Sequence, residues 1–436
     1  MKIAYSDKSV TAWGGMIEMK RLIDKSNLRK ALESIGLPES LSNNSICVID
    51  IVESFMVSVW IGCYKFSHTA VVRLDETLKK IFGWERIPSG TTYGRFFQKF
   101  NIEKNTEVFV KLNTWFFNQL QFDNYTLDVD SSVFTRYGEQ EGAEKGYNPT
   151  KRGRKSHHPL FAFVSGIRMV ANCWLRSGAT SSSNNILAFL DETMRILENK
   201  KIGLLRGDSG FFSNMILEKL ESKLIQYVIA AKMHYRLQES IAGIQAWVQL
   251  DKNLWIAETQ YKAQKWDTVR RIVVIRQSKI LNENSTGKQL TLYAEDAAYY
   301  NFKYHSFVTN QELPAQEIWE QYKRRGDAEN RIKELKDDFG VEGFNMDSFY
   351  GTEATMKMIT VAYNMMILFR QVTGQTTVHP RLTTLRFNCF AVGSWIVKKG
   401  NSNVLKMAVP LKRRKWYDGL FSGINKTDLP LSLTVT

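Results

Sequence analysis

Cysteine is scarce in this sequence, and the few cysteines lie far apart. The 436 residues contain only four, Cys47, Cys63, Cys173 and Cys389, and no C-x2-C pair. Zinc knuckles and disulfide frameworks need closely spaced cysteines, so neither is indicated, and a reducing cytosol fits. Long apolar runs are missing too, because no stretch approaches the length of a bilayer span and the first residues lack an apolar signal core. We therefore expect a cytoplasmic protein without a membrane partner.

Acidic residues are too few to balance the basic ones. The chain has 59 lysines and arginines against 44 aspartates and glutamates, a net charge of +15 and a pI near 9.4. Such an excess favours a polyanionic partner, and without a membrane segment that partner is nucleic acid. Hydrophobic residues make up 44% of the chain, ample for a large core, but 436 residues are too many for one compact unit without insertions.

One stretch, residues 321–336, has the pattern of a catalytic helix. Read as a single helix, it places four residues within about 60° of arc: Tyr322, Arg325, Glu329 and Lys336. Its apolar side, predicted to dock on the core, consists of Ala328, Ile332, Leu335 and Phe339. One carboxylate flanked by a phenol and two cations suits a metal-dependent phosphodiester enzyme. For any one of these residues, a solvated helix of mixed charge is the alternative.

Two further acids lie on a predicted strand. Residues 125–133 alternate apolar and polar side chains, so Asp128 and Asp130 share one face. Neighbouring carboxylates repel each other and cost stability unless a cation is near. An exposed edge strand, with both acids solvated, is the alternative, but the apolar hairpin that follows favours a central strand.

A third candidate acid, Asp208, ends an apolar strand that begins at Ile202, and a Ser-Gly turn follows it. The carboxyl ends of strands are where α/β sheets place their chemistry. Aspartate is also a good helix N-cap, and the two roles do not exclude each other.

Cations gather in the segment 144–159, which is rich in glycine and proline and which we expect to form no regular element. A solvated loop is one interpretation. The other is a clamp for backbone phosphates near the strand acids, formed by Lys151, Arg152, Arg154 and Lys155.

The four-residue pattern of the 321–336 stretch matches the Y-x2-R-x3-E-x6-K signature of cut-and-paste DDE transposases from bacterial insertion sequences. The chain resembles them from about residue 120 to 340, and the segments 204–211 and 13–15 look most like insertion-sequence family thirteen-eighty. The resemblance implies an α/β fold with a ribonuclease H-like catalytic core. It also implies a catalytic triad of acids, here Asp130, Asp208 and Glu329, with Asp128 as the alternative to Asp130.

The order of predicted elements gives the domain boundaries. We expect a helical N-terminal domain for DNA binding or dimerisation (1–118), a first core part (119–232), a β-rich insertion (233–310), closing core helices (311–376) and a basic C-terminal region (377–436). Strands are predicted in the insertion at 254–261, 269–275, 290–293 and 304–309. Trp266 there is either a core aromatic or a platform for an extruded DNA base.

The resulting hypothesis is a transposase that binds the ends of an insertion sequence and cuts and joins DNA. Three carboxylates would hold two Mg²⁺ ions, or Mn²⁺ in their place, while Tyr322, Arg325 and Lys336 position phosphates. The resemblance further implies hairpin-forming cleavage and a homodimer acting on double-stranded DNA in a bacterial nucleoid. A DNA-binding descendant that no longer cuts, and a structure-specific ribonuclease H-like nuclease, are the alternatives.

Overall fold

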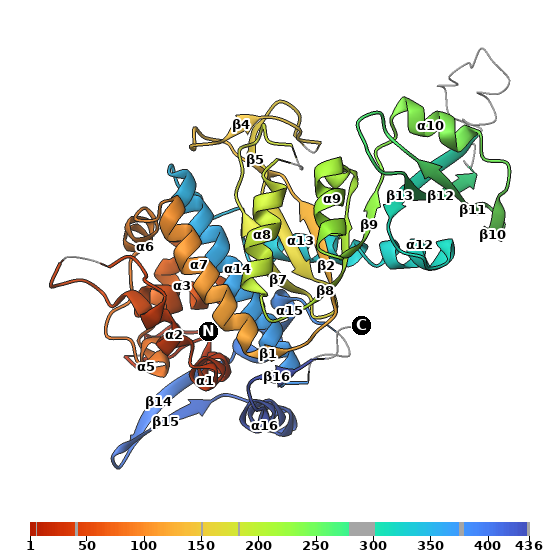
Figure 1. The fold of residues 1–436 in the computed structure, drawn as a ribbon. Coiled ribbons are helices and arrows are strands. Elements are labelled where there is room, and N and C mark those ends of the chain that lie inside the picture. Colours follow the sequence, from red (N-terminus) through yellow and green to blue (C-terminus); the bar gives the residue numbers. More distant parts are fainter. Residues whose placement is uncertain are drawn as a thin grey trace.

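The computed structural model shows a mixed α/β protein organised around one nine-stranded sheet (Figure 1). It describes residues 1–5, 7–39, 42–149, 151–181, 184–278, 301–374 and 379–433. The strands of the sheet, in spatial order, are β10 (Val248–Asp251), β11 (Leu254–Tyr261), β12 (Arg270–Ser278), β13 (Phe302–Thr309), β9 (Gln226–Ala230), β8 (Ile202–Gly207), β2 (Tyr125–Ser131), β6 (Leu160–Val164) and β7 (Met169–Trp174).

The strand that carries two of the candidate acids lies in the middle of this sheet. β2 pairs in parallel with β8 on one side and antiparallel with β6 on the other. The edge-strand alternative is therefore wrong. Helices α8 (Ile186–Ile196) and α9 (Asn214–Ser222) connect β7 to β8 and β8 to β9, as the sequence order predicts. All five residues of β6 are buried, because helices cover the sheet and no face of this strand meets water.

The predicted insertion continues the same sheet. β13 pairs antiparallel with β9, and β12, β11 and β10 follow outward, so the β-rich segment extends the core. It also contains a helix, α10 (Tyr235–Ala242), which lies beside β11. The predicted strands at 254–261, 269–275 and 304–309 are confirmed with ends that agree within three residues, whereas 290–293 lies outside the described residues.

Helices dominate the first 118 residues. The α-helices are α1 (Ile17–Ser26), α2 (Leu28–Ser34), α3 (Val48–Ile61), α4 (Ala70–Arg73), α5 (Glu76–Phe82), α6 (Gly90–Phe97) and α7 (Ile102–Asn118). Ser89 caps α6, because its side chain accepts a hydrogen bond from the backbone N–H of Thr92. α3 is buried almost throughout and packs against α14 (Phe349–Val372), so these helices share the core that covers the nine-stranded sheet.

The prediction of one helix over 321–336 is wrong. The chain forms α12 (Ala315–Lys323) and α13 (Gly326–Asp337), separated at Arg324 and Arg325. Hydrogen bonds to the third preceding residue form the turn, with Arg325 N donating to Tyr322 O at 2.9 Å. The two helices dock on different cores: Ile318 packs with residues of β12 and β13, and Leu335 packs in the main core. A straight helix cannot serve both surfaces, and Gly326 weakens the helix at this point.

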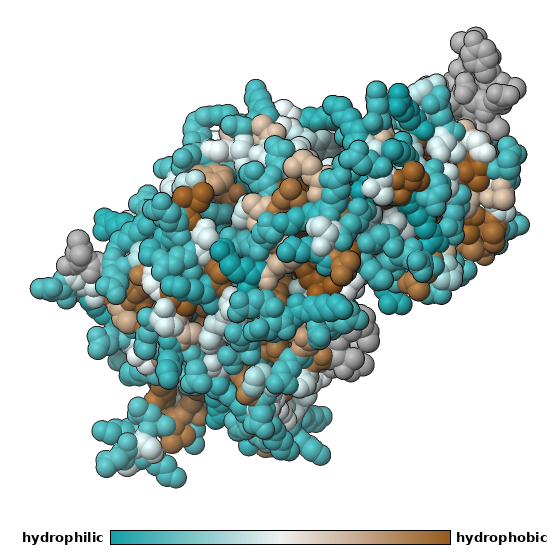
Figure 2. Space-filling view, viewed as in Figure 1, coloured by the Kyte–Doolittle hydropathy of each residue, from teal (hydrophilic) through white to brown (hydrophobic). Residues whose placement is uncertain are grey.

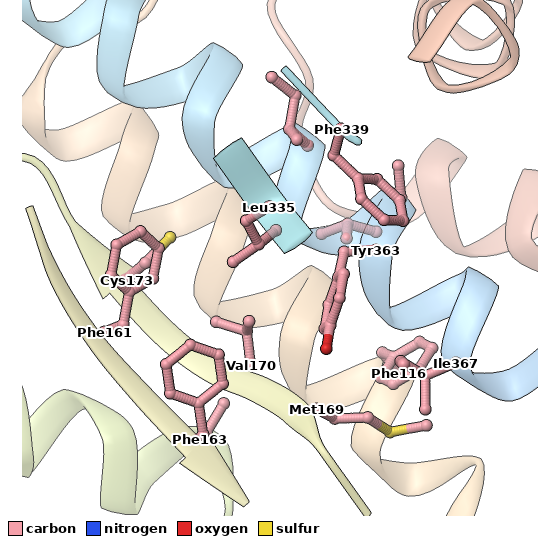
Figure 3. Packing of buried hydrophobic residues seen from close by; sticks show 14 of the residues in the cluster. Phe116, Phe161, Phe163, Met169, Val170, Cys173, Leu335, Phe339, Tyr363 and Ile367 are labelled. Atoms are coloured by element: carbon pink, nitrogen blue, oxygen red, sulfur yellow. The ribbon is translucent and has the colours of Figure 1, made fainter. Parts of the chain in front are cut away.

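The apolar side of α13 points into the main core, as its pattern predicts. Figure 3 shows Leu335 and Phe339 beside Tyr363 of α14, with Val170 of β7 below. Leu335 and Phe339 are fully buried, and the ring of Phe339 lies 5.2 Å from that of Tyr363. This contact holds the opposite, polar side of α13 toward the carboxyl end of β2, which α13 contacts.

The segment 144–159 is more regular than predicted. Its ends form β4 (Glu144–Lys145) and β5 (Lys155–His157), which join β3 (Phe134–Thr135) in a small antiparallel sheet. The prediction of no regular element is therefore wrong at both ends. Arg152 and Arg154 lie in the turn between these strands.

The C-terminal residues form a hairpin and a helix. The hairpin, β14 (Ser394–Lys399) with β15 (Ser402–Met407), extends away from the body (Figure 1). Figure 2 shows hydrophobic side chains on this hairpin, within a face that is otherwise mostly hydrophilic. The helix is α16 (Leu411–Lys426). The remaining elements are short: η1 (Gly14–Met16), η2 (Phe66–Thr69), η3 (Ser209–Phe211), η4 (Arg386–Phe390), α15 (Leu382–Leu385), and the parallel pair β1 (Leu120–Gln121) and β16 (Leu431–Ser432). No helix in the described residues is long and apolar enough to span a bilayer.

Candidate active site

Asp130 lies near the carboxyl end of β2 and is buried there. Its carboxylate accepts two contacts: the backbone N–H of Ser131 at 2.8 Å, and Nη2 of Arg325 at 2.9 Å. Arg325 comes from the α12–α13 turn, so this ion pair joins the sheet to the helix that carries Glu329. The guanidinium of Arg325 is 6% exposed, which strengthens its interaction with the carboxylate.

Asp208 follows the last residue of β8, the strand parallel to β2. Its side chain accepts a hydrogen bond from Gly210 N at 2.9 Å, so it caps the short helix η3. Asp208 therefore caps a helix and is also a candidate catalytic acid, two roles that do not exclude each other. One carboxylate oxygen holds the turn, which fixes the direction in which the other points.

Glu329 reaches the same region from the first turn of α13. Its Oε1 lies 3.6 Å from Nη1 of Arg325, and its side chain is 68% exposed. Arg325 therefore contacts Asp130 and Glu329 at once. The structure thus brings a strand acid and the helix acid to opposite sides of one guanidinium.

The pKa of Asp130 responds to the charges of both other acids. Burial raises this pKa to about 6, Arg325 opposes the rise, and the charges of Asp208 and Glu329 add to it. Mutual repulsion of this kind is relieved when a cation lies between the carboxylates. The acids thus form one electrostatic unit.

These residues suit a divalent metal by donor type. All three are carboxylates, the donors that Mg²⁺ and Mn²⁺ prefer. Within the described residues no group of three acids, histidines or cysteines already surrounds a vacant metal position. The guanidinium of Arg325 lies 2.9 Å from Oδ1 of Asp130 and so already neutralises one of the candidate ligands.

The other two residues of the signature also reach this edge of the sheet. The ring of Tyr322 packs 4.4 Å from that of Phe307, and burial raises the pKa of its phenol, with Asp208 and Asp130 adding to the rise. Lys336 donates to the carbonyl of Val133 at 2.9 Å, just beyond β2. Its ammonium is also 2.7 Å from Glu342, so part of its charge is already compensated.

The predicted phosphate clamp forms a basic hollow of about 320 Å³ next to β5. Lys155 pairs with Glu139, Lys151 donates to the hydroxyl of Tyr137, and Arg154 lies over the Tyr137 ring at 5.9 Å. Arg152 lines the same hollow and is exposed. Arg152, Arg154 and Lys155 therefore line one hollow, with Lys151 next to Arg152 in the chain, and Lys151, Arg154 and Lys155 already contact protein groups.

Trp266 is buried among other side chains, whereas a base-stacking platform needs an exposed ring. Its indole is 7% exposed and lies 5.3 Å from the ring of Phe212 and 5.7 Å from that of Tyr261. Arg270 covers it at 4.7 Å. This is the core aromatic that the sequence left as the other interpretation, so Trp266 has no part in the site as we describe it.

The sequence interpretation missed Arg206. This residue lies in β8, directly opposite Asp128, and both are almost fully buried. Its Nε and Nη2 donate to the two oxygens of Asp128 at 2.6 and 2.8 Å. An arginine inside an apolar strand is a sign of a buried acidic partner, because charged residues are rarely buried unpaired. Asp128 thus has a partner of its own, while Asp130 faces the other acids.

We compared the sequence and the structure with those of known proteins. The profile of the family described as transposase DDE domain, group 1, matches residues 1–428. Among solved structures, the cryo-EM structure of the piggyBac transposase synaptic complex with hairpin DNA is similar, at 10% identity and a TM-score of 0.49, over 88% of this chain and 81% of that chain. A likeness this distant carries no functional argument. A search of curated proteins finds no significant match. The family profile spans nearly the whole chain, and the protein therefore belongs to the DDE transposases, enzymes that cleave DNA and transfer its strands.

Proposed function

We propose that Asp130, Asp208 and Glu329 are the catalytic acids of this transposase and that they bind two Mg²⁺ ions at the DNA phosphate to be cut. The observation that carries the proposal is the double contact of Arg325 with Asp130 and Glu329, next to Asp208. Carboxylates from two parallel strand ends and one helix, all at one edge of a sheet, are suited to this chemistry. The arrangement also supports a ribonuclease H-like core.

In this mechanism the protein's own residues position and polarise the DNA. Bound divalent metal supplies the charge that activates a water or a 3′-hydroxyl and stabilises the leaving oxygen. Arg325 would move its guanidinium from Asp130 to a phosphate oxygen, to which it can donate two hydrogen bonds. Tyr322 would donate from its phenol, which is protonated at neutral pH and whose pKa burial raises further.

The DNA would continue from the acids across the basic hollow. Arg152, Arg154 and Lys155 line this hollow, and Lys151 lies in the turn just before β5. The small sheet follows β2 directly, because β3 begins three residues after Ser131. Their contact with phosphates would add affinity without reading sequence. We also propose, from the Y-R-E-K resemblance alone, transposon ends of a bacterial insertion sequence as substrate, hairpin formation during cleavage and a homodimer in the active complex.

A nicking assay tests the proposal. The substrate is a duplex that carries the inverted repeats found beside the gene, incubated with Mg²⁺ or with EDTA. Asp208→Asn should bind this duplex like the wild type but fail to nick it. The matched control is Asp251→Asn, an exposed aspartate at the far end of the sheet in β10, which should nick normally. Nicking by Asp208→Asn at the wild-type rate, or wild-type nicking in EDTA, would overturn the proposal.

A further inference from the structure

We infer that Arg206, held by Asp128, is a positioning residue: it fixes the α12–α13 turn against the sheet and so sets where Arg325 and Glu329 meet the strand acids. This inference rests on the proposed function of Glu329. It assigns to Asp128 a role different from metal binding.

The guanidinium of Arg206 connects three separate segments. Two of its nitrogens hold both oxygens of Asp128 in β2, and Nη2 also donates to the hydroxyl of Ser165 at 2.7 Å. The remaining nitrogen, Nη1, donates to the backbone carbonyl of Gln321 at 2.5 Å. Arg206 is 3% exposed and Asp128 1%, so water does not compete for these hydrogen bonds.

The carbonyl of Gln321 is one that α12 cannot satisfy by itself. It belongs to the last turn of the helix, where carbonyls have no partner within the helix. An arginine is suited to bind such a group. The chain then turns at once: Tyr322 follows, and Arg325 N donates to Tyr322 O. Arg206 therefore holds the backbone carbonyl four residues before Arg325, at the end of α12.

Stability alone does not account for this pair. Buried ion pairs are costly to desolvate, and apolar residues of similar size often serve a protein core as well or better. The residues next to this pair along the strands include Leu127, Val129 and Leu205, which are apolar and buried. What an apolar pair lacks is a donor that reaches the Gln321 carbonyl. Positioning of the turn is thus the property that Asp128 and Arg206 supply and that hydrophobic replacements do not.

Small displacements at this point matter for catalysis. A shift of the turn by about 1 Å would move Arg325 and Glu329 relative to Asp130, and misplacements of that size cost on the order of 100-fold in rate. DNA affinity should change much less, because it depends on phosphate contacts spread over a wide surface.

The test compares two double variants of the full chain. Asp128→Leu with Arg206→Met removes the clamp but keeps an apolar core. The matched control is Glu221→Leu with Arg270→Met, which removes another arginine–carboxylate pair with two hydrogen bonds, between α9 and β12. Each protein is measured for thermal unfolding, duplex binding, Mg²⁺-dependent nicking and, without metal, amide hydrogen exchange of the peptide 321–329.

We expect the clamp variant to stay folded and bind DNA, to nick on the order of 100-fold more slowly, and to exchange amides faster in 321–329. The control should match the wild type in nicking and in exchange of that peptide. A folded clamp variant with wild-type exchange and nicking would overturn the inference. If it does not fold, Arg206→Lys takes its place, because a lysine keeps the charge pair but cannot also reach Gln321. Failure of the wild type to nick would reject the proposed function, while the exchange data would still decide on the clamp.

Discussion

Nη2 of Arg325 lies 2.9 Å from Oδ1 of Asp130, so the signature arginine forms an ion pair with the strand acid that we assign to metal binding. The same guanidinium is 3.6 Å from Glu329. One cation of the protein therefore occupies the space between two candidate ligands. Exchange of this arginine for metal, with the arginine transferred to the DNA phosphate, is a simple way to couple substrate binding to assembly of the site.

Removing the guanidinium of Arg325 should change the pH dependence of DNA cleavage. Burial already raises the pKa of Asp130 to about 6, and Arg325 works against that rise. In Arg325→Gln the pKa of Asp130 should rise further, by about 1 unit or more. Because metal binding needs the deprotonated acid, the acidic limb of the pH–rate profile should move to higher pH. Arg324→Gln, at the exposed neighbouring position, is the control. Superimposable profiles for all three proteins would contradict this role of Arg325.

Glutamate-to-glutamine substitutions at two positions of α13, Glu329 and Glu334, should differ in their effect on stability. Glu329 is 68% exposed, so Glu329→Gln should change the free energy of unfolding by less than about 0.5 kcal/mol. Its nicking rate should nevertheless fall by at least about 100-fold, because a metal ligand is lost. Denaturant unfolding and a nicking time course measure both.

Glu334, in the same helix, is buried and accepts a hydrogen bond from Arg370 at 2.6 Å. Glu334→Gln leaves the Arg370 charge unpaired and should cost about 3 kcal/mol of stability. Equal effects of the two substitutions on stability would mean that α13 does not present Glu329 to solvent as we describe.

If the basic hollow binds DNA phosphates, its cations should contribute to the salt dependence of DNA affinity. The logarithm of the DNA association constant falls linearly with the logarithm of the salt concentration, and each phosphate contact that is lost should make this slope less negative by about 0.9. Arg152→Ala should show this change on duplexes of any sequence, measured by fluorescence anisotropy at several salt concentrations. Lys262→Ala, an exposed lysine just after β11, should leave the slope unchanged. An unchanged slope in Arg152→Ala would remove this residue from the DNA path.

A buried acid far from the site should make stability depend on pH. Glu18 in α1 is 1% exposed, and neither carboxylate oxygen has a hydrogen-bond partner among the described residues. Burial raises its pKa from 4.5 to about 8, although Arg21 opposes this. Because the folded state binds the proton more tightly, stability should be highest at acidic pH and fall as pH rises toward 8.

Substitution of this acid tests the sign of the effect. Glu18→Gln should remove the decline in melting temperature between acidic and mildly alkaline pH, whereas Glu33→Gln, at an exposed position in α2, should not. Parallel melting curves for Glu18→Gln and the wild type across that range would show that the Glu18 carboxyl is not buried as described.

Local pattern was sufficient to predict much of the fold. The alternation around Asp130, the apolar strand before Asp208 and the apolar side of α13 all follow from periodicity, and the strands and the buried face are observed. The break between α12 and α13 at Arg325 could not be predicted from periodicity. It arises because α12 and α13 dock on two different cores, and that is a property of the folded sheet.

The parts of the site that depend on distant contacts were beyond the sequence. Asp128 and Arg206 are 78 residues apart, and only the parallel register of β2 and β8 places them opposite each other. The pairing of β13 with β9, which joins the inserted segment to the core, is equally non-local. Spacing within the 321–336 segment therefore placed Arg325 beside Glu329, as observed, but could not predict the contacts that hold the turn in place.

The central claim is that Asp130, Asp208 and Glu329 work as one metal-binding unit. The most direct measurement is the Mg²⁺-dependent nicking rate of Asp130→Asn, Asp208→Asn, Glu329→Gln and the triple variant, on the same transposon-end duplex. If the acids act together, each single variant should lose nearly all activity and the triple variant should be little worse than any of them. Losses that add up from independent steps, or one single variant that nicks like the wild type, would contradict the account.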